Sequence, residues 1–105
     1  MPVDLRSDTV TRPTTLMRQA MMDAALGDVC MGDDPTVHRL EALAAERLGK
    51  EAAIFVPTGS MSNQIGLALH AGLGDAALVE AEAHIANWEG GGAAASSGIQ
   101  LRTVA

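Results

Sequence analysis

The segment from Ala52 to Gln64 constrains the fold of this chain more than any other. It opens with an apolar run, Ala52–Val56, whose β-branched and aromatic residues are typical of a short buried strand ended by Pro57. Gly59 then permits close backbone approach, Ser60 can cap a helix, and apolar residues recur at helical spacing. A strand that turns directly into a helix directs free backbone N–H groups at one point, and that point suits a phosphate.

This turn has a second interpretation when it is taken alone. It lacks the long Gly-rich spacing and the Gly-Lys pair of a Walker loop. An ordinary strand-to-helix turn is therefore the alternative to a phosphate site, and the other motifs of the chain have to decide between the two.

The composition limits the class of protein. The 105 residues are enough for one small core, and the apolar share of 48% argues against disorder. The net charge of −6 and the scattered basic residues argue against a nucleic-acid partner. A single cysteine, Cys30, leaves no internal disulfide and fits a reducing compartment, so we expect a cytoplasmic protein. No apolar run approaches the roughly 20 residues of a membrane span, and charged residues interrupt any signal peptide.

Periodicity and turn residues predict an alternation of helices and strands. Asp34 and Pro35 give the clearest helix start, Gly49 ends that helix, and Gly27 is placed to end the one before it. The expected elements are helices over 14–26, 35–48 and 60–71, strands over 52–56, 76–80 and 99–104, and a partly helical segment over 81–89 before Gly90–Gly92. This pattern predicts an α/β fold with a sheet covered on both faces. Three strands are too few for a complete sheet of this kind, so we expect a piece of a longer protein.

Four segments in this order resemble the N-terminal part of a threonine aldolase. They are residues 4–13, 32–37 and 48–64, and Ala83-His84 with Glu89-Gly90-Gly91. The resemblance implies the aspartate-aminotransferase-like (type I) fold of pyridoxal-phosphate enzymes, with an incomplete sheet. It also implies a division of the chain, with an N-terminal arm and helices over 1–50 and the start of the cofactor-binding α/β domain over 51–105.

The resemblance assigns a cofactor pocket for pyridoxal 5'-phosphate. Gly59 and Ser60, with Thr58 beside them, would bind the cofactor phosphate at the helix start. His84 would stack on the pyridine ring and would either position it or act as a catalytic base. Glu89 matches an acidic family position near the cofactor. No metal is implied. General chemistry agrees with the assigned pocket, because a dianionic phosphate suits a helix N-terminus and the cofactor supplies the electron sink.

The resemblance also implies a reaction and partners. Ser7 would help to hold the carboxylate of an amino-acid substrate, and the complete enzyme would cleave L-threonine or L-allo-threonine to glycine and acetaldehyde. The other expected partners are the remainder of the polypeptide and further copies in a homodimer or homotetramer, without nucleic acid or membrane. β-Elimination on the same cofactor is a second interpretation. A phosphate-binding or interaction module without chemistry is a third.

The chain departs from the family pattern in two informative ways, a residue type at position 31 and the absence of a lysine suited to hold the cofactor. Met31 stands where the family usually has a tyrosine, which leaves substrate preference and subunit exchange open. Lys50 is the only lysine and precedes the phosphate turn, so the Schiff-base lysine is expected beyond residue 105. The chain alone is therefore expected to be inactive.

Other chemically suggestive residues have simpler explanations. His38 lies among charged residues on the second expected helix, where a solvated face suffices, and His70 lies near a helix C-terminus, where a dipole interaction suffices. Asp33-Asp34 can suggest a metal, but a helix start already explains Asp34. Cys30 has no adjoining basic partner that would make it a nucleophile.

Overall fold

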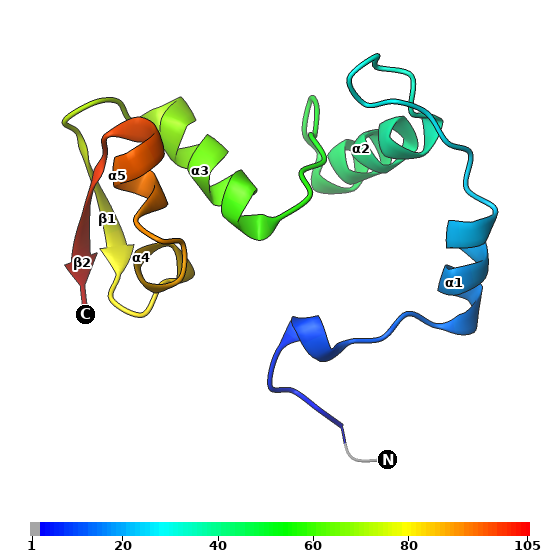
Figure 1. Cartoon of the computed structure of the whole chain (residues 1–105), viewed down its shortest axis with the longest axis horizontal. Coiled ribbons are helices and arrows are strands. Elements are labelled where there is room, and N and C mark those ends of the chain that lie inside the picture. The colour runs from blue at the N-terminus through cyan, green and yellow to red at the C-terminus, as the bar shows by residue number, and fades with distance from the viewer. Residues whose placement is uncertain (1–2) are drawn as a thin grey trace. The chain divides into compact units, whose positions relative to one another are not determined.

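The computed structural model describes residues 3–105, drawn in Figure 1. The chain divides into two compact units, Met1–Phe55 and Val56–Ala105, and each is described by itself. Every helix in the described range is too short or too polar to span a bilayer.

The first unit consists of helices joined by loops. Its elements are the 3-10 helix η1 (Asp8–Val10), α1 (Thr15–Met22) and α2 (Pro35–Leu48). The start of α2 confirms its prediction, because Asp34 Oδ1 accepts hydrogen bonds from the backbone N–H groups of Thr36 at 2.9 Å and Val37 at 3.0 Å. Its end is also confirmed, since Gly49 adopts the left-handed conformation with φ of 61°.

The helix expected over 14–26 is shorter than predicted. Thr14 caps α1 by accepting a hydrogen bond from Met17 N, but the helix ends at Met22, with Asp23 as its C-cap. Gly27 therefore does not end it. A Cβ at Gly27 would collide with the backbone of Asp33, so this glycine instead allows two parts of the loop to approach each other closely.

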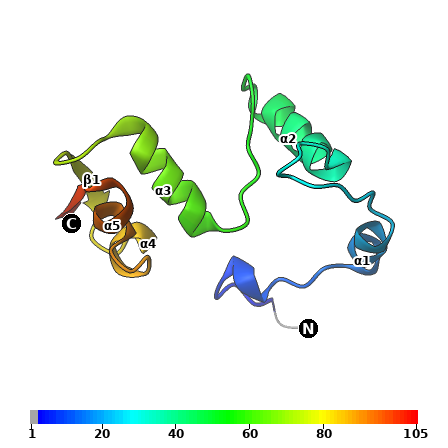
Figure 2. The same ribbon diagram turned by 45° about the horizontal axis from the view of Figure 1, so that its top comes forward.

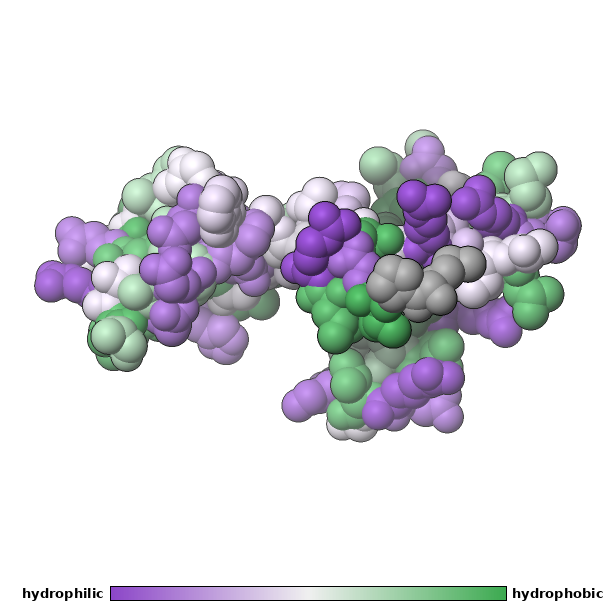
Figure 3. Space-filling model, turned by 90° about the horizontal axis from the view of Figure 1, so that it is seen from below, coloured by the Kyte–Doolittle hydropathy of each residue, from purple (hydrophilic) through white to green (hydrophobic). Residues whose placement is uncertain are grey.

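Large apolar side chains remain on the surface of the first unit, as the green areas of Figure 3 illustrate. Ala45 is the one buried apolar residue among residues 3–55. The large apolar side chains of α1 and α2 are thus largely uncovered within this unit. Leucines and methionines of these two helices are between 41% and 82% exposed, namely Leu16, Met17, Met21, Met22, Leu40, Leu43 and Leu48.

The second unit is a small parallel α/β arrangement. Its elements are α3 (Gly59–His70), β1 (Ala76–Glu80), α4 (His84–Asn87), α5 (Gly92–Ser97) and β2 (Gln100–Val104). The two strands pair in parallel from Ala76 opposite Gln100 to Glu80 opposite Val104. The helix expected over 60–71 and both of these strands are therefore confirmed within one residue, and α4 confirms that the segment expected over 81–89 is partly helical.

Helix α5 forms the centre of the second unit. It packs against both α3 and β2, and the two ribbon views agree on this placement (Figures 1 and 2). Ala93 and Ile99, in and just after α5, are each only 1% exposed. The sequence did not predict this helix, because a Gly-, Ala- and Ser-rich stretch resembles a loop. Small side chains nevertheless allow it to approach its neighbours closely, and Gly98 ends it at a φ of 64°.

The strand expected over 52–56 is wrong. In the described chain the sheet contains β1 and β2 alone, and residues 52–56 have no regular secondary structure. An extended segment needs a neighbouring strand for its backbone groups, and neither strand of the sheet pairs with this one. Phe55 N donates instead to a side chain, Glu41 Oε1, at 2.7 Å.

Candidate functional site: an open helix start and a histidine–carboxylate pair

The first turn of α3 is shaped by Thr58. Its Oγ1 accepts a hydrogen bond from Met61 N at 3.1 Å, so Thr58 is the N-cap of the helix. The expectation that Ser60 caps the helix is therefore wrong, because Ser60 already lies inside it. Ser62 closes the turn by donating from Oγ to the carbonyl of Gly59 at 2.7 Å.

The amides of Gly59 and Ser60 are available at this helix start. Neither has an acceptor within residues 3–105, as expected for the first N–H groups of a helix. A Cβ built on Gly59 would meet no heavy atom of the described chain within 4 Å, so the turn is open on that side. Two free amides, the Thr58 hydroxyl and the positive end of the helix dipole fit a phosphate group.

His84 lies beyond the carboxyl end of β1. It opens the short helix α4, and its side chain is 62% exposed. Asn87 fixes the segment that precedes this helix, because its Nδ2 donates to the carbonyls of Ala81 at 2.8 Å and Ala83 at 3.2 Å. An exposed ring at this edge fits the stacking role expected of it, since ligands of parallel α/β sheets bind beyond the carboxyl ends of the strands.

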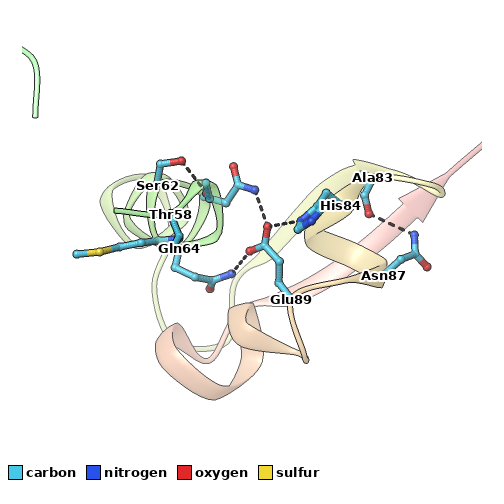
Figure 4. A network of polar contacts seen from close by, with 10 residues as sticks. Thr58, Ser62, Gln64, Ala83, His84, Asn87 and Glu89 are labelled. Carbon is cyan, nitrogen blue, oxygen red and sulfur yellow. Dashed lines mark hydrogen bonds and ion pairs between the residues drawn. The ribbon is translucent and has the colours of Figure 1, made fainter. Parts of the chain in front are cut away.

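Glu89 connects this histidine to α3. Its carboxylate lies 2.9 Å from His84 Nδ1, and it accepts hydrogen bonds from Asn63 Nδ2 at 2.6 Å and Gln64 Nε2 at 2.7 Å (Figure 4). The side chain of Glu89 is only 2% exposed. A buried carboxylate requires such donors, so these contacts explain how an acid can occupy this position.

The same contacts affect the ionisation of Glu89. The hydrogen bond from Asn63 is the largest cause that lowers the pKa of Glu89 below its ordinary value, and those from His84 and Gln64 act in the same direction. Burial opposes them, because it raises the pKa, but the hydrogen bonds prevail. Glu89 is therefore an ionised carboxylate at neutral pH.

Sequence reasoning assigned no role to Asn63 and Gln64. They lie 26 and 25 residues from Glu89 in the chain, and the fold brings them to its carboxylate. The signal available in the sequence was their position. Two adjacent amide side chains, one turn after a predicted phosphate-binding turn, can supply donors to an acid that has to be buried.

The remaining predicted residue, Ser7, belongs to the first unit. Its Oγ accepts a hydrogen bond from Thr9 N at 3.2 Å and caps η1. The residues Thr58, Gly59, Ser60, His84 and Glu89 all belong to the second unit, where α3 joins the helix start to the His84–Glu89 pair. The structure thus groups five of the six predicted residues in one unit and leaves Ser7 in the other.

The parallel strand pair and its helices define an α/β protein. The open helix start and the histidine–carboxylate pair beyond a strand end give it a candidate ligand site. Comparison with known families makes the class specific. The model of the family described as beta-eliminating lyase matches residues 4–105, and the chain belongs to this family.

Individual relatives share about half of their residues with the chain over the matched length. The low specificity L-threonine aldolase of Escherichia coli (strain K12) is 52% identical over 102 residues, which cover 97% of this chain and 31% of that protein. The low-specificity L-threonine aldolase 1 of Arabidopsis thaliana is 47% identical over 103 residues, which cover 97% of this chain and 29% of that protein. The chain therefore spans about three-tenths of the length of these relatives.

Proposed function

We propose that the full-length protein containing this chain is a pyridoxal-phosphate-dependent aldolase that cleaves L-threonine and L-allo-threonine to glycine and acetaldehyde. The similarity to low-specificity threonine aldolases, at 52% and 47% identity over 97% of the chain, is the observation that carries the proposal. The family match over residues 4–105 spans the helix start at Thr58 and the His84–Glu89 pair. The substrate assignment rests on the names of those relatives.

The beta-eliminating lyase family is pyridoxal-phosphate-dependent, and the residues of this chain fit that cofactor. The amides of Gly59 and Ser60, with the Thr58 hydroxyl, would hold its phosphate at the start of α3. The exposed ring of His84 would stack on its pyridine ring. When bound, the cofactor supplies an electron sink for the carbon–carbon cleavage.

Two side chains of this chain would act on the amino acid itself. Ser7 would hold its carboxylate by hydrogen bonding, and His84 would either orient the reacting groups or accept the proton of the substrate's side-chain hydroxyl. A well-placed general base typically contributes about 10²- to 10⁴-fold to the rate. An imidazole can both accept and donate a proton, so it is a suitable group for such a transfer.

The rest of the proposal concerns the complete polypeptide. We propose that this chain forms the N-terminal part of a type I fold, with the lysine that holds the cofactor in the remaining sequence. We further propose a homodimer or homotetramer in the cytoplasm. The many exposed leucines and methionines of the first unit support additional burial in the complete protein, because contiguous apolar surface of this kind marks interfaces.

β-Elimination is the second candidate, and the family description favours it. The two reactions leave different products from the same substrate. Cleavage between Cα and Cβ converts threonine to glycine and acetaldehyde, whereas elimination of the hydroxyl converts it to 2-oxobutyrate and ammonia. Met31, which is 79% exposed in a loop of the first unit, is compatible with either reaction.

The experiment that tests the proposal is a product analysis. The full-length protein, loaded with pyridoxal phosphate, is incubated with L-threonine and L-allo-threonine in separate reactions. Equimolar glycine and acetaldehyde would support the aldolase. 2-Oxobutyrate with ammonia would assign the eliminating activity instead. If both substrates yield no product at all, the proposed function is wrong.

A further inference from the structure

The His84–Glu89 pair is asymmetric in its exposure to solvent. The carboxylate of Glu89 is only 2% exposed, whereas the side chain of His84 is 62% exposed. Glu89 therefore contacts the imidazole at Nδ1 (Figure 4), while more than half of the His84 side chain remains exposed. An acid in this position is too enclosed by its own protein donors to serve as an open binding group.

The hydrogen-bonding chemistry of this contact determines the state of the ring. An ionised carboxylate can only accept hydrogen bonds, so the nitrogen at 2.9 Å from it has to carry the proton. When the imidazole is neutral, its free electron pair is then on the other nitrogen, Nε2.

From this geometry we propose that Glu89 is a positioning residue, which fixes His84 in its Nδ1–H tautomer and leaves Nε2 as the proton acceptor on the exposed side. This inference deepens the proposed aldolase function and rests on it for the identity of the reaction. If His84 is the base, the substrate O–H bond breaks, its electron pair stays on oxygen, and the proton bonds to Nε2. Glu89 keeps its negative charge throughout and stabilises the imidazolium.

The two amides of α3 keep Glu89 in place. Asn63 shares Oε1 with His84, while Gln64 donates to Oε2, so each carboxylate oxygen has a donor from the helix. The charge of Glu89 also dictates which way Gln64 points, because its amide oxygen would be repelled by the carboxylate. As a result Gln64 Oε1 is buried and has no hydrogen-bond partner among residues 3–105, while Nε2 of the same amide donates to Glu89.

Gly92 makes room for this arrangement. A Cβ at residue 92 would lie 2.8 Å from Gln64 Nε2 and 2.9 Å from its Cδ. A side chain at the first residue of α5 would therefore displace the amide of Gln64 from its position beside Glu89. Three helices thus contribute to the position of the imidazole: α4 carries His84, α3 carries the amides that bond to Glu89, and α5 begins with the glycine beside Gln64.

The direct test is the tautomer of His84 in the full-length protein without added cofactor. Histidine is labelled with ¹⁵N in the ring, long-range ¹H–¹⁵N correlations are recorded near pH 8, and the His84 signals are assigned by their loss in His84→Asn. We expect a protonated Nδ1 and an unprotonated Nε2. A wild-type ring protonated at Nε2 would overturn the proposal without the use of any variant of Glu89.

Variants of Glu89 then separate positioning from a general structural role. In Glu89→Ala we expect the Nδ1–H form to lose its dominance, with no such change in the control Glu82→Ala, an exposed acid on the same segment. Glu89→Gln should retain the Nδ1–H form, because an amide oxygen can still accept from the ring and Gln64 can turn its own amide so that Oε1 accepts from the new NH₂ group. An unchanged tautomer in Glu89→Ala, or its loss in Glu89→Gln, contradicts the proposal.

Kinetics of the cofactor-loaded protein provide an independent measurement. Outer partners of ligand histidines in metal sites typically contribute about 10- to 100-fold, and we expect a fall in kcat of this order for Glu89→Ala with little change in KM. In the His84→Asn background the same substitution should have no further effect, since Glu89 acts through His84. Multiplied losses would overturn the proposal. If the protein does not cleave threonine at all, the proposed function fails, while the tautomer measurement still decides the role of Glu89.

Discussion

The two units of this chain have equally well-marked helix starts but differ in what packs against their helices. In the first unit, Asp34 caps α2 with two hydrogen bonds, yet Leu40 and Leu43 on that helix are 48% and 41% exposed. In the second unit, α3 is capped by Thr58 alone, but α5 packs against it, and two side-chain amides of α3 donate to Glu89. Local signals are thus sufficient to start a helix, whereas a site needs contacts between segments that are distant in sequence.

The largest expected effect concerns the site itself and depends on the second unit. In the full-length enzyme, replacing His84 by Asn should reduce turnover about 10²- to 10⁴-fold if the imidazole is a base. The loss of ring stacking alone should instead weaken cofactor affinity by about 1 kcal/mol with a smaller effect on turnover. Steady-state kinetics and a cofactor titration of the same preparation separate these outcomes.

His38→Asn is the matched control, because His38 is exposed on α2 in the first unit. It should leave both quantities at their wild-type values. Wild-type turnover and affinity in His84→Asn would remove this histidine from the site. Such a result would also contradict the contrast between the two units, because His84 of the second unit would then matter no more to the reaction than His38 of the first.

Packing, not capping, should dominate the stability of the second unit. Gly92→Ala places a methyl group against the amide end of the Gln64 side chain, which then has to shift away from Glu89, and the unit should lose about 1.5–3 kcal/mol, the usual contribution of a hydrogen bond to a charged group. Gly66→Ala is its control, since a Cβ there meets no heavy atom of the described chain within 4 Å, and in the middle of α3 it should be neutral or stabilising by about 0.5–1 kcal/mol. Hydrogen exchange of peptides from α3 and α5 in the full-length protein reports both changes, and equal effects at the two positions would argue against tight packing at Gly92.

In the first unit a cap should matter most. Asp34→Ala removes the acceptor for two backbone N–H groups and should cost about 0.5–2 kcal/mol, whereas Asp34→Asn keeps an acceptor oxygen and should cost little. The measurement is the exchange rate of amides in the first turn of α2. A loss that is as large in Asp34→Asn as in Asp34→Ala would mean that the charge, and not the hydrogen bond, stabilises this helix.

This contrast also explains how much of the molecule could be predicted from its sequence. The limits of α2 and β1 were predictable because Asp34, Pro35 and Gly49 act locally and because residues 76–80 are a short apolar run between turns. The run over 52–56 has the same local character but forms no strand, since nothing in the described chain pairs with it. The composition of a segment reports a preference, and only a partner converts that preference into a strand.

The site shows the same division between local and distant information. The helix start at Gly59 could be predicted from a glycine and hydroxyl residues in sequence, although the cap is Thr58 and not Ser60. The role of Asn63 and Gln64 could not, because it depends on where the fold places Glu89, 26 and 25 residues further along the chain. The division of the six predicted residues follows from this: five lie in the unit whose segments pack together, and Ser7 lies in the other.

The smallest expected effect uses pH to compare a carboxylate in each unit. Hydrogen bonds lower the pKa of Glu89 below 4.5, chiefly that from Asn63, and a hydrogen bond from Arg6 lowers the pKa of Asp4 below 3.8. A carboxyl whose pKa is lower in the folded protein stabilises it above the unfolded value, and this stabilisation is lost as the pH falls through the folded value. Exchange protection of residues 81–92, corrected for intrinsic rates, should therefore decline below about pH 4.5 in the wild type and stay level in Glu89→Gln.

The corresponding change in the first unit should be close to zero. The Asp4–Arg6 pair is exposed, with the two side chains 41% and 80% accessible, and solvent and salt screen its attraction. Asp4→Asn should thus leave the pH dependence of exchange in residues 3–12 unchanged at an ionic strength near 0.5 M. If protection of residues 3–12 declines with falling pH as steeply as that around Glu89, a lowered pKa is sufficient to make stability depend on pH. If protection declines in the second unit alone, the effect comes from the contacts of the Glu89 carboxylate with Asn63, Gln64 and His84.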